Sequence, residues 1–209
     1  MTLIDFIRHG ETETPGRLLG RTDSPLSAAG RQQFERQTAG RTWAAIVASP
    51  LCRAREPAER LAQAHGLSAR VDEDWAELDF GIWDGRLIEV LQADPVASRQ
   101  LDGLYASSEA AAVPGGESWA ALQARVARAL ECLIDEAAPA TMLVVTHAGP
   151  MRAAIALACG IPFASLWAIK IDPGTRVTLR AGRDVAGNVW GEIVEIVQPE
   201  ITQHGIAQP

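Results

Sequence analysis

The sequence predicts an α/β fold, a three-layer sandwich in which helices cover both faces of a mostly parallel central sheet. Short apolar runs rich in β-branched residues alternate with longer segments of helical periodicity, and this alternation is typical of α/β layers. Two of the apolar runs, 3–7 and 143–146, end in polar residues followed closely by a glycine. Such endings indicate buried strands that stop at a ligand-binding edge of the sheet.

The first half of the chain is expected to continue with a helix, a strand and a second helix. Ser27 is a candidate N-cap for a helix that reaches about Trp43. The run 45–48 predicts the next strand. A helix over about 53–65 should end at Gly66, because glycine readily adopts the left-handed conformation that stops a helix.

The second half begins with a long amphipathic helix for which Ser118 is the expected cap. The run 143–146 is the clearest central strand, and a helix follows it to Cys159 with Gly160 as its cap. Closing strands are expected at 167–172, 175–179 and 189–197, with a tight turn at 172–174 between the first two.

The length of 209 residues fits a single domain, which we take to span 1–209. The segment from about 86 to 113 has the least pattern, and we interpret it as a cap or lid over the ligand crevice. A net charge of -7 argues against binding to nucleic acids or membrane surfaces, which needs a basic field. The oligomeric state stays open between monomer and homodimer.

The three cysteines show no metal-ligand spacing and cannot all pair, which fits a reducing compartment. The first residues lack the basic and apolar regions of a secretory signal. No apolar run approaches the roughly 18 residues that a membrane span needs. We therefore expect a cytoplasmic location.

The motif Arg8-His9-Gly10-Glu11-Thr12 directly follows the first strand. It places an arginine and an imidazole side by side at a strand end. An imidazole held beside a fixed cation can attack an anionic phosphorus centre and carry the phosphoryl group. By itself, however, a five-residue motif can also arise by chance.

Three further positions carry related chemistry. Arg53 lies in the first turn of a helix after a strand, where free backbone N–H groups and the helix dipole favour phosphate. His147 offers a second imidazole at a strand end. Glu77 is a carboxylate in otherwise apolar company, with Glu73, Asp74 and Asp79 as nearby alternatives.

In this order, the motifs resemble those of the histidine phosphatase superfamily, also called phosphoglycerate-mutase-like. The resemblance covers nearly the whole chain and implies that family's fold. Its pieces are 8–12, 20–27 with Gly30, 49–54, Glu77 with 80–85, 116–118 and 144–149. The chain departs from the family at Pro15, where an asparagine close to the phosphate is usual, and Arg17 or Arg21 is a candidate substitute.

The resemblance implies a role for each matching residue. His9 would be the nucleophile that becomes phosphohistidine, and Arg8, Arg53 and His147 would bind the phosphoryl oxygens. Glu77 would protonate the leaving oxygen and then activate water. No cofactor or metal is implied, and further substrate contacts are expected from Gly20, Arg21 and Ala148.

Physical reasoning supports the nucleophile, because positive charge from Arg8 and Arg53 disfavours the imidazolium form of His9. Other polar and aromatic residues near the motifs are interpreted separately. Glu11 and Glu117 are expected to be turn or cap residues. Trp83 and Trp119 are the two of the six tryptophans that we expect to face a substrate.

Hydrolysis of a small-molecule phosphate ester is the favoured reaction. Cofactor-dependent phosphoglycerate mutases of the superfamily are usually longer and carry an insertion and a tryptophan-asparagine pair that this chain lacks. An inactive phospholigand-binding module would be expected to lose a reacting group, and all are present here. Within the superfamily the chain resembles α-ribazole phosphatases in length and in 8–12, 16–26 and 165–174, which points to α-ribazole 5′-phosphate, while a broad-specificity sugar-phosphate phosphatase remains an alternative.

Overall fold

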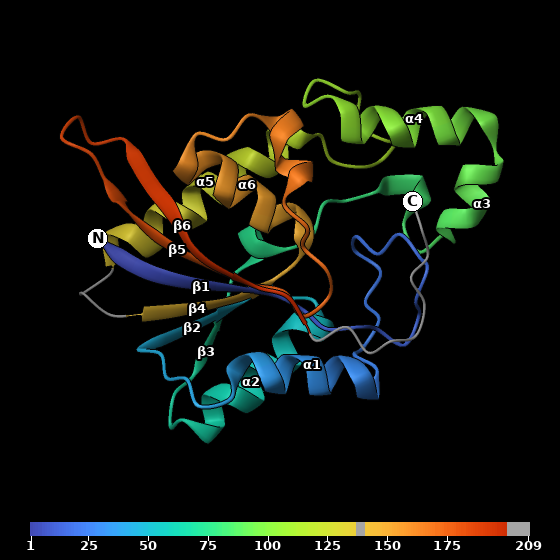
Figure 1. Cartoon of the computed structure of the whole chain (residues 1–209). Helices are drawn as coiled ribbons and strands as arrows, with labels where there is room; N and C mark the ends of the chain where they lie inside the picture. The colour runs from blue at the N-terminus through green and yellow to red at the C-terminus, as the bar shows by residue number, and fades with distance from the viewer. Residues whose placement is uncertain (137–140, 200–209) are drawn as a thin grey trace.

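The computed structural model describes residues 1–136 and 141–199 of the chain. Its centre is a six-stranded sheet in the order β3-β2-β4-β1-β5-β6 (Figure 1). The strands are β1 (Thr2–Arg8), β2 (Ala45–Ala48), β3 (Ala69–Val71), β4 (Thr141–Thr146), β5 (Arg176–Arg183) and β6 (Val189–Val197). β1 to β4 pair in parallel, whereas β5 runs antiparallel to both β1 and β6, so the predicted mostly parallel sheet is confirmed.

Helices cover both faces of this sheet (Figure 1). On one face, α1 (Ala28–Thr38) and α2 (Cys52–Ala64) bury an apolar cluster that includes Phe34, Ile46 and Val145. On the other face, α5 (Trp119–Glu136) and α6 (Ala148–Cys159) close a larger core around Phe6 and Val144. The three-layer α/β sandwich predicted from the sequence is therefore confirmed.

Most elements lie where their sequence signals predict them. Ser27 caps α1 by accepting a hydrogen bond from the Gly30 N–H, and Ser118 accepts one from Ala121 at the start of α5. Gly66 and Gly160 have positive φ angles just after α2 and α6, as expected of glycine stops. In these cases local backbone chemistry is enough to set the helix ends.

Two predicted elements are wrong. The first helix ends at Thr38 rather than near Trp43, because Ala39 turns extended and the Trp43 indole instead donates a hydrogen bond to the buried Asp5 carboxylate at 2.8 Å. The segment 167–172 is not a strand, since a 3-10 helix covers Phe163–Ala168 and packs its aromatic side chains against α6 and α4. Tertiary contacts override the local pattern at both places.

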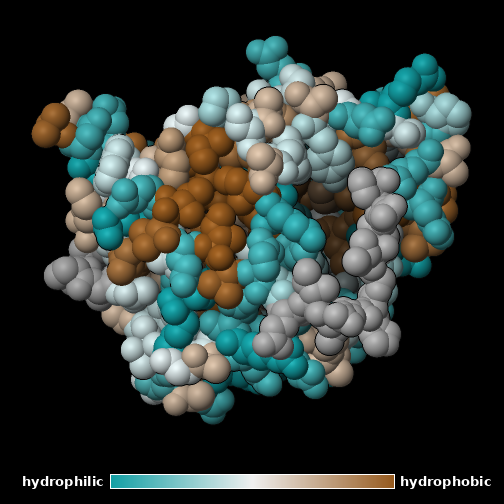
Figure 2. Space-filling view, in the orientation of Figure 1, coloured by the Kyte–Doolittle hydropathy of each residue, from teal (hydrophilic) through white to brown (hydrophobic). Residues whose placement is uncertain are grey.

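The segment 86–113 contains α3 (Ile88–Ala93) and α4 (Pro95–Ala106), which lie beside the sandwich rather than in its layers (Figure 1). They enclose a separate apolar cluster of Leu18, Trp83, Leu91, Ala97, Leu101 and Val113. Figure 2 shows the surface hollowed between these helices and the rest of the molecule, with apolar residues inside the hollow. The role of this segment as a cap stays a prediction. So does the single domain over 1–209, part of which lies outside the described residues.

The register of the central strands decides which residues meet at the sheet edge. Arg8 at the end of β1 pairs with Thr146 at the end of β4, and Ala48 at the end of β2 pairs with Val145. The residues that follow these strands, His9, His147 and Ser49, therefore emerge next to one another. In the described part of the chain, no helix is both long and apolar enough to cross a bilayer.

Candidate active site

His9 is held as a single tautomer by its own loop. Its Nδ1 lies 2.7 Å from the carbonyl oxygen of Gly10. A carbonyl only accepts, so Nδ1 carries the proton and Nε2 keeps a free lone pair. Gly10 is required here because a Cβ at this position would overlap the carbonyl of Gly30 at the start of α1. The loop thus presents His9 with an unprotonated Nε2.

His147 is held in the same Nδ1–H tautomer, but by a contact at its other ring nitrogen. Its Nε2 lies 2.7 Å from the hydroxyl oxygen of Ser49, and both side chains are fully buried. That oxygen also accepts a hydrogen bond from the Leu51 N–H, and its proton has no other acceptor among the described residues. The hydroxyl therefore donates to Nε2, so His147 carries its proton on Nδ1. This Nδ1–H is buried and has no hydrogen-bond partner within the described ranges.

The two imidazoles contact each other edge to face, with ring centres 5.0 Å apart. Burial lowers the pKa of both rings well below 6.5, and the nearby charges of Arg53 and Arg8 lower each pKa further. The two arginines therefore lower the pKa of His9, as expected from the sequence, but burial lowers it more. Both histidines are neutral at neutral pH.

Arg53 lies in the first turn of α2, fully buried. Its terminal nitrogens donate to the carbonyls of Leu19 and Gly20 at 3.0 and 2.8 Å and to that of Thr22 at 2.9 Å. Its Nε has no hydrogen-bond partner in the described part of the chain. Burial lowers the pKa of Arg53, but a guanidinium remains charged under all ordinary conditions.

Arg8, the last residue of β1, provides a second fixed cation and lines the pocket. One terminal nitrogen donates to the Ile171 carbonyl at 2.7 Å, which anchors the side chain to the loop before β5. Its Nε is buried and unpartnered among the residues described. Arg8 and Arg53 act electrostatically on His9, and His147 contacts its ring. Arg8 Nε, Arg53 Nε and His147 Nδ1 are thus three donors near His9 without an acceptor among the described residues, and a tetrahedral oxyanion could supply one to each.

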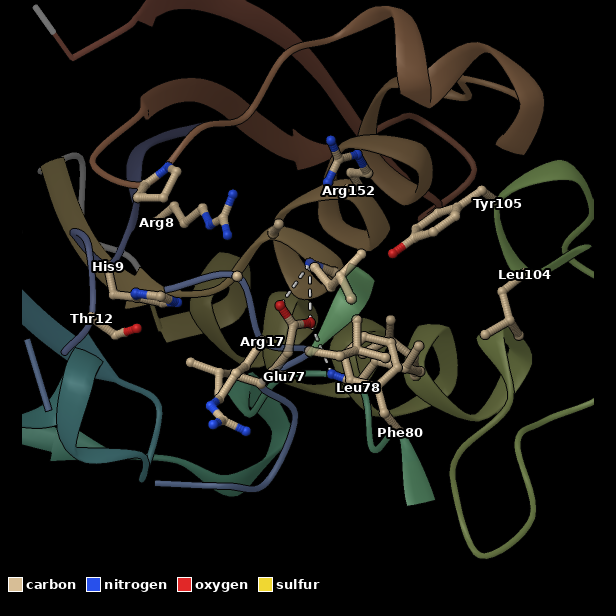
Figure 3. Close-up of a pocket in the computed structure, with 18 of the residues that line it drawn as sticks. Arg8, His9, Thr12, Arg17, Glu77, Leu78, Phe80, Leu104, Tyr105 and Arg152 are labelled. Atoms are coloured by element: carbon tan, nitrogen blue, oxygen red, sulfur yellow. Dashed lines mark hydrogen bonds between the residues drawn. The ribbon is translucent and has the colours of Figure 1, made fainter. Parts of the chain in front are cut away.

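Glu77 places a carboxylate in the pocket that also contains Arg8 and His9 (Figure 3). It is 8% exposed, and its Oε1 accepts hydrogen bonds from the backbone N–H groups of Leu78 and Gly149 at 2.8 and 3.1 Å. Arg125 donates a hydrogen bond to the backbone carbonyl of Glu77 at 3.0 Å, and its side chain also forms an ion pair with Glu117. Glu117 is thus part of the support for this loop, consistent with the structural role expected of it.

The alternatives to Glu77 lie elsewhere. Asp74 pairs with Arg128, and Asp79 accepts a hydrogen bond from Gly81. Neither they nor Glu73 line the pocket that contains His9. Glu77 shares the pocket lining with Glu11, whose carboxylate accepts a hydrogen bond from the Ser27 hydroxyl at the start of α1. That Glu77 transfers the proton stays a proposal.

The pocket has a volume of about 510 Å³, far more than one phosphate needs. Arg8, His9, Glu77 and the first residues of α6, Ala148 and Gly149, form its polar end. Its other walls are largely apolar and include Leu18, Leu78, Phe80, Ile88, Leu104, Trp119 and Trp167. This lining suits a substrate with an organic body beyond its phosphate.

The predicted substrate contacts divide into two groups. Arg8 and Ala148 line the pocket, as does Arg17, whereas the fully buried Arg53 and His147 are not among its lining residues. Gly20 and Arg21 do not line it either. Both of these donate a backbone N–H to Asp84, so the structure places them in a loop whose carbonyls hold Arg53. Pro15 and Arg17 both line the pocket, so Arg17 is the better placed of the two arginines to replace the usual asparagine contact, and that role stays a prediction.

Of the two suspected tryptophans, one faces the pocket. Trp119 lines it, but Trp83 is 3% exposed and belongs to the apolar cluster beneath α3 and α4. Trp83 instead lines a second, smaller cavity of about 160 Å³ next to α4, so its facing a substrate stays a prediction.

Sequence reasoning missed Arg152, Tyr105, Trp167 and Ser49. Arg152 follows Ala148 by four residues on α6, and this helical spacing could have placed it on the same face. Ser49 could have been found from its position after β2, level with Thr146. Tyr105 and Trp167 come from elements without a clear pattern, so no local signal was available.

The arrangement can bind a tetrahedral oxyanion, attack it with a neutral imidazole and move a proton through a carboxylate. A family model described as "Histidine phosphatase superfamily (branch 1)" matches residues 4–189. The chain belongs to the histidine phosphatase superfamily. Among the described residues of this histidine phosphatase, no group of three or more His, Cys, Asp or Glu is placed to hold a metal ion.

Two curated relatives show the range of the family. "Bifunctional protein Rv2228c" of Mycobacterium tuberculosis is 33% identical over 179 residues, which are 82% of this chain and 48% of that protein. The chain thus spans about half the length of this relative. The "Probable phosphoglycerate mutase GpmB" of Salmonella paratyphi C is 32% identical over 78% of this chain and 77% of its own length.

Solved structures agree in fold. Mycobacterial glucosyl-3-phosphoglycerate phosphatase Rv2419c superposes with a TM-score of 0.80 at 25% identity, covering 92% of this chain and 97% of that one. The α-ribazole phosphatase of Shigella flexneri has a TM-score of 0.77 at 23% identity over 92% and 94% of the two chains. These proteins share a fold with this chain while differing in named substrate.

Proposed function

We propose that this histidine phosphatase hydrolyses phosphomonoesters of small molecules through a phosphohistidine on His9. The observation that carries the proposal is which ring nitrogen each histidine leaves free. Both carry the proton on Nδ1, but the neighbours leave the Nε2 lone pair of His9 free as a nucleophile and the Nδ1–H of His147 free as a donor, in two rings that contact each other. Neutral His9 attacks, while neutral His147 can still donate from Nδ1. No other pair of described imidazoles is arranged in this way.

In the first step, Nε2 of His9 attacks phosphorus and the bond from phosphorus to the ester oxygen breaks. The carboxyl group of Glu77 gives its proton to the departing oxygen, which leaves as an alcohol. Arg8, Arg53 and His147 would donate to the three non-bridging oxygens as charge builds up on them. The products of this step are the free alcohol and phosphohistidine.

In the second step, water attacks the phosphorus of phosphohistidine. Its proton passes to the Glu77 carboxylate, the bond to Nε2 breaks and inorganic phosphate leaves. His9 and protonated Glu77 are thereby restored. A mutase would return the phosphoryl group to another hydroxyl instead, and the resemblance to GpmB makes this the second candidate.

The proposal is tested with a panel of esters that includes α-ribazole 5′-phosphate, 3-phosphoglycerate, glucosyl-3-phosphoglycerate and sugar phosphates. The sequence resemblance makes the first of these one candidate substrate. A kcat/KM advantage of at least ~100-fold, about 2.7 kcal/mol of differential transition-state binding, would identify the preferred ester. Similar values across the panel would indicate broad specificity, and conversion of 3-phosphoglycerate to its isomer without phosphate release would indicate a mutase.

His9→Ala should abolish turnover of every ester and prevent labelling of the protein by ³²P substrate. The matched control is His65→Ala, which removes an exposed imidazole at the end of α2 and should keep wild-type rates. Wild-type turnover by His9→Ala would disprove the nucleophile. EDTA should leave activity intact, and loss that a divalent ion restores would contradict the metal-free mechanism.

A further inference from the structure

Arg152 is a cation in the pocket whose guanidinium makes no hydrogen bond to the residues that the structure describes. It projects from α6 (Figure 3). Its Cζ lies 4.5 Å from the centre of the Trp167 ring. Its Nε and the Nε1 of Trp167 are both buried and lack a partner among the described residues. No described carboxylate lies within ion-pair distance of its guanidinium. Stacking therefore fixes the position of this charge without neutralising it.

The carboxylates that influence Arg152 are engaged elsewhere. Glu77 and Asp172 both act on its charge electrostatically. However, Glu77 accepts backbone hydrogen bonds from Leu78 and Gly149, and Asp172 pairs with Lys170 at 2.9 Å. Burial and the charge of Arg8 lower the pKa of Arg152, and a bound anion would stabilise its charged form.

The reacting phosphate does not account for this charge. A phosphate dianion carries two charges, and Arg8 and Arg53 beside His9 already match them. Figure 3 shows Arg8 and His9 at one end of the pocket, Tyr105 and Leu104 at the other, and Arg152 between them. Arg152 is thus placed toward the part of the pocket where the alcohol portion of the ester would lie.

Tyr105 of α4 adds a second hydrogen-bond donor to the same part of the pocket. Its ring contacts the edge of Trp167 at 4.8 Å between centres, and its hydroxyl points into the pocket (Figure 3). Phe163 packs on Trp167 at 5.7 Å and completes the support. A guanidinium and a phenol on one aromatic base offer several donors to a single acceptor group.

We infer that Arg152 and Tyr105, supported by Trp167, form a subsite for a second anionic group on the substrate. This inference rests on the proposed function. It names the substrate class as small phosphomonoesters whose alcohol portion carries a carboxylate or a second phosphate. Esters of neutral alcohols would occupy the same pocket without using the subsite.

The test uses two pairs of esters that differ in one negative charge. These are 4-carboxyphenyl against 4-carbamoylphenyl phosphate, and 3-phosphoglycerate against glycerol 3-phosphate. Wild-type protein should favour the charged member of at least one pair by about 10- to 100-fold in kcat/KM, as expected for a charge-assisted hydrogen bond. Arg152→Met should reduce this preference to near unity while changing the neutral esters by less than about 3-fold. Arg152→Lys, which keeps the charge but loses the planar fork, should retain part of the preference.

Arg60→Met is the matched control, because it removes an exposed arginine of α2 outside the pocket and should leave every ratio unchanged. Each variant is checked for a wild-type circular dichroism spectrum and melting temperature. Equal loss on charged and neutral esters would overturn the inference by assigning Arg152 to the reacting phosphate. An unchanged ratio in both pairs would also overturn it. Neither result affects the proposed function, which fails only if the wild type hydrolyses no ester or if turnover persists without His9.

Discussion

At the residue scale, the chemistry of this site depends on where two protons are. The Gly10 carbonyl and the Ser49 hydroxyl assign them, one to His9 Nδ1 and the other to His147 Nδ1. Identical side chains thus become a nucleophile and a donor through their neighbours alone. Ser49 is fully buried, does not line the pocket and acts through its hydrogen bond with His147, so it is a positioning residue.

Ser49→Ala should therefore reduce catalysis without removing a reacting group. His147 loses the donor that fixes its tautomer, and we expect kcat/KM to fall by about 10- to 100-fold, less than the roughly 100- to 1,000-fold that follows the outright removal of a donor to a developing charge. NMR of ¹⁵N-labelled histidine should show His147 protonated on Nδ1 in the wild type and as a mixture in the variant. Ser98→Ala on α4 is the control. Unchanged tautomer populations and rates in Ser49→Ala would contradict this role.

At the scale of elements, the start of α6 brings several functions together. His147 is its N-cap, Ala148 lines the pocket, and the Gly149 N–H orients Glu77. A Cβ at Gly149 would overlap Oε1 of Glu77, so glycine is needed for close approach rather than for a special backbone angle. By contrast, a Cβ at Gly103 of α4 would meet no atom within 4 Å.

This contrast gives a matched pair of substitutions. Gly149→Ala should displace Glu77 and lower kcat/KM by about 10- to 100-fold for alkyl phosphates, but much less for p-nitrophenyl phosphate, whose leaving oxygen hardly needs a proton. Glu77→Gln should show the same selectivity. Gly103→Ala should keep full activity and raise the free energy of unfolding by about 0.5–1 kcal/mol. Equal losses by Gly149→Ala on both ester types would count against Glu77 as the acid.

At the scale of the whole molecule, burying two neutral imidazoles makes the fold sensitive to acid. Their pKa values lie well below 6.5 in the folded protein, whereas the unfolded chain protonates them near 6.5. As the pH falls below 6.5, the unfolded state binds more protons, so stability decreases until the folded pKa values are reached. Above about pH 7 both states are neutral at these positions and this contribution is constant.

Urea unfolding at pH 7.5 and 5.5 in phosphate-free buffer should reveal this effect. Each buried histidine costs up to about 1.4 kcal/mol per pH unit below 6.5, so the wild type should lose about 2 kcal/mol more than a His9→Gln, His147→Gln double variant. Other groups titrate alike in both proteins and cancel in the comparison. Equal losses would show that the two imidazoles take up protons without cost in the folded state.

The fold was predictable where local patterns carry it. The strands β1, β2 and β4 and the helices α2, α5 and α6 follow from apolar periodicity, caps and glycine stops. The errors at Trp43 and at 167–172 share a cause, because both involve tryptophans whose partners are distant in sequence: Asp5 for Trp43, and Arg152 and Tyr105 for Trp167. No window of neighbouring residues contains that information.

By itself, the sequence determined the order of the motifs and hence the family, together with the strand-end positions of Arg8, His9 and His147. It could do so because these residues follow apolar strands whose periodicity is a local signal. Only the tertiary structure decided the histidine tautomers, the exclusion of Gly20, Arg21 and Trp83 from the pocket, and the pairing of Arg152 with Trp167. Hydrogen-bond partners, burial and stacking join residues far apart in the chain, so they exist only once the layers have packed.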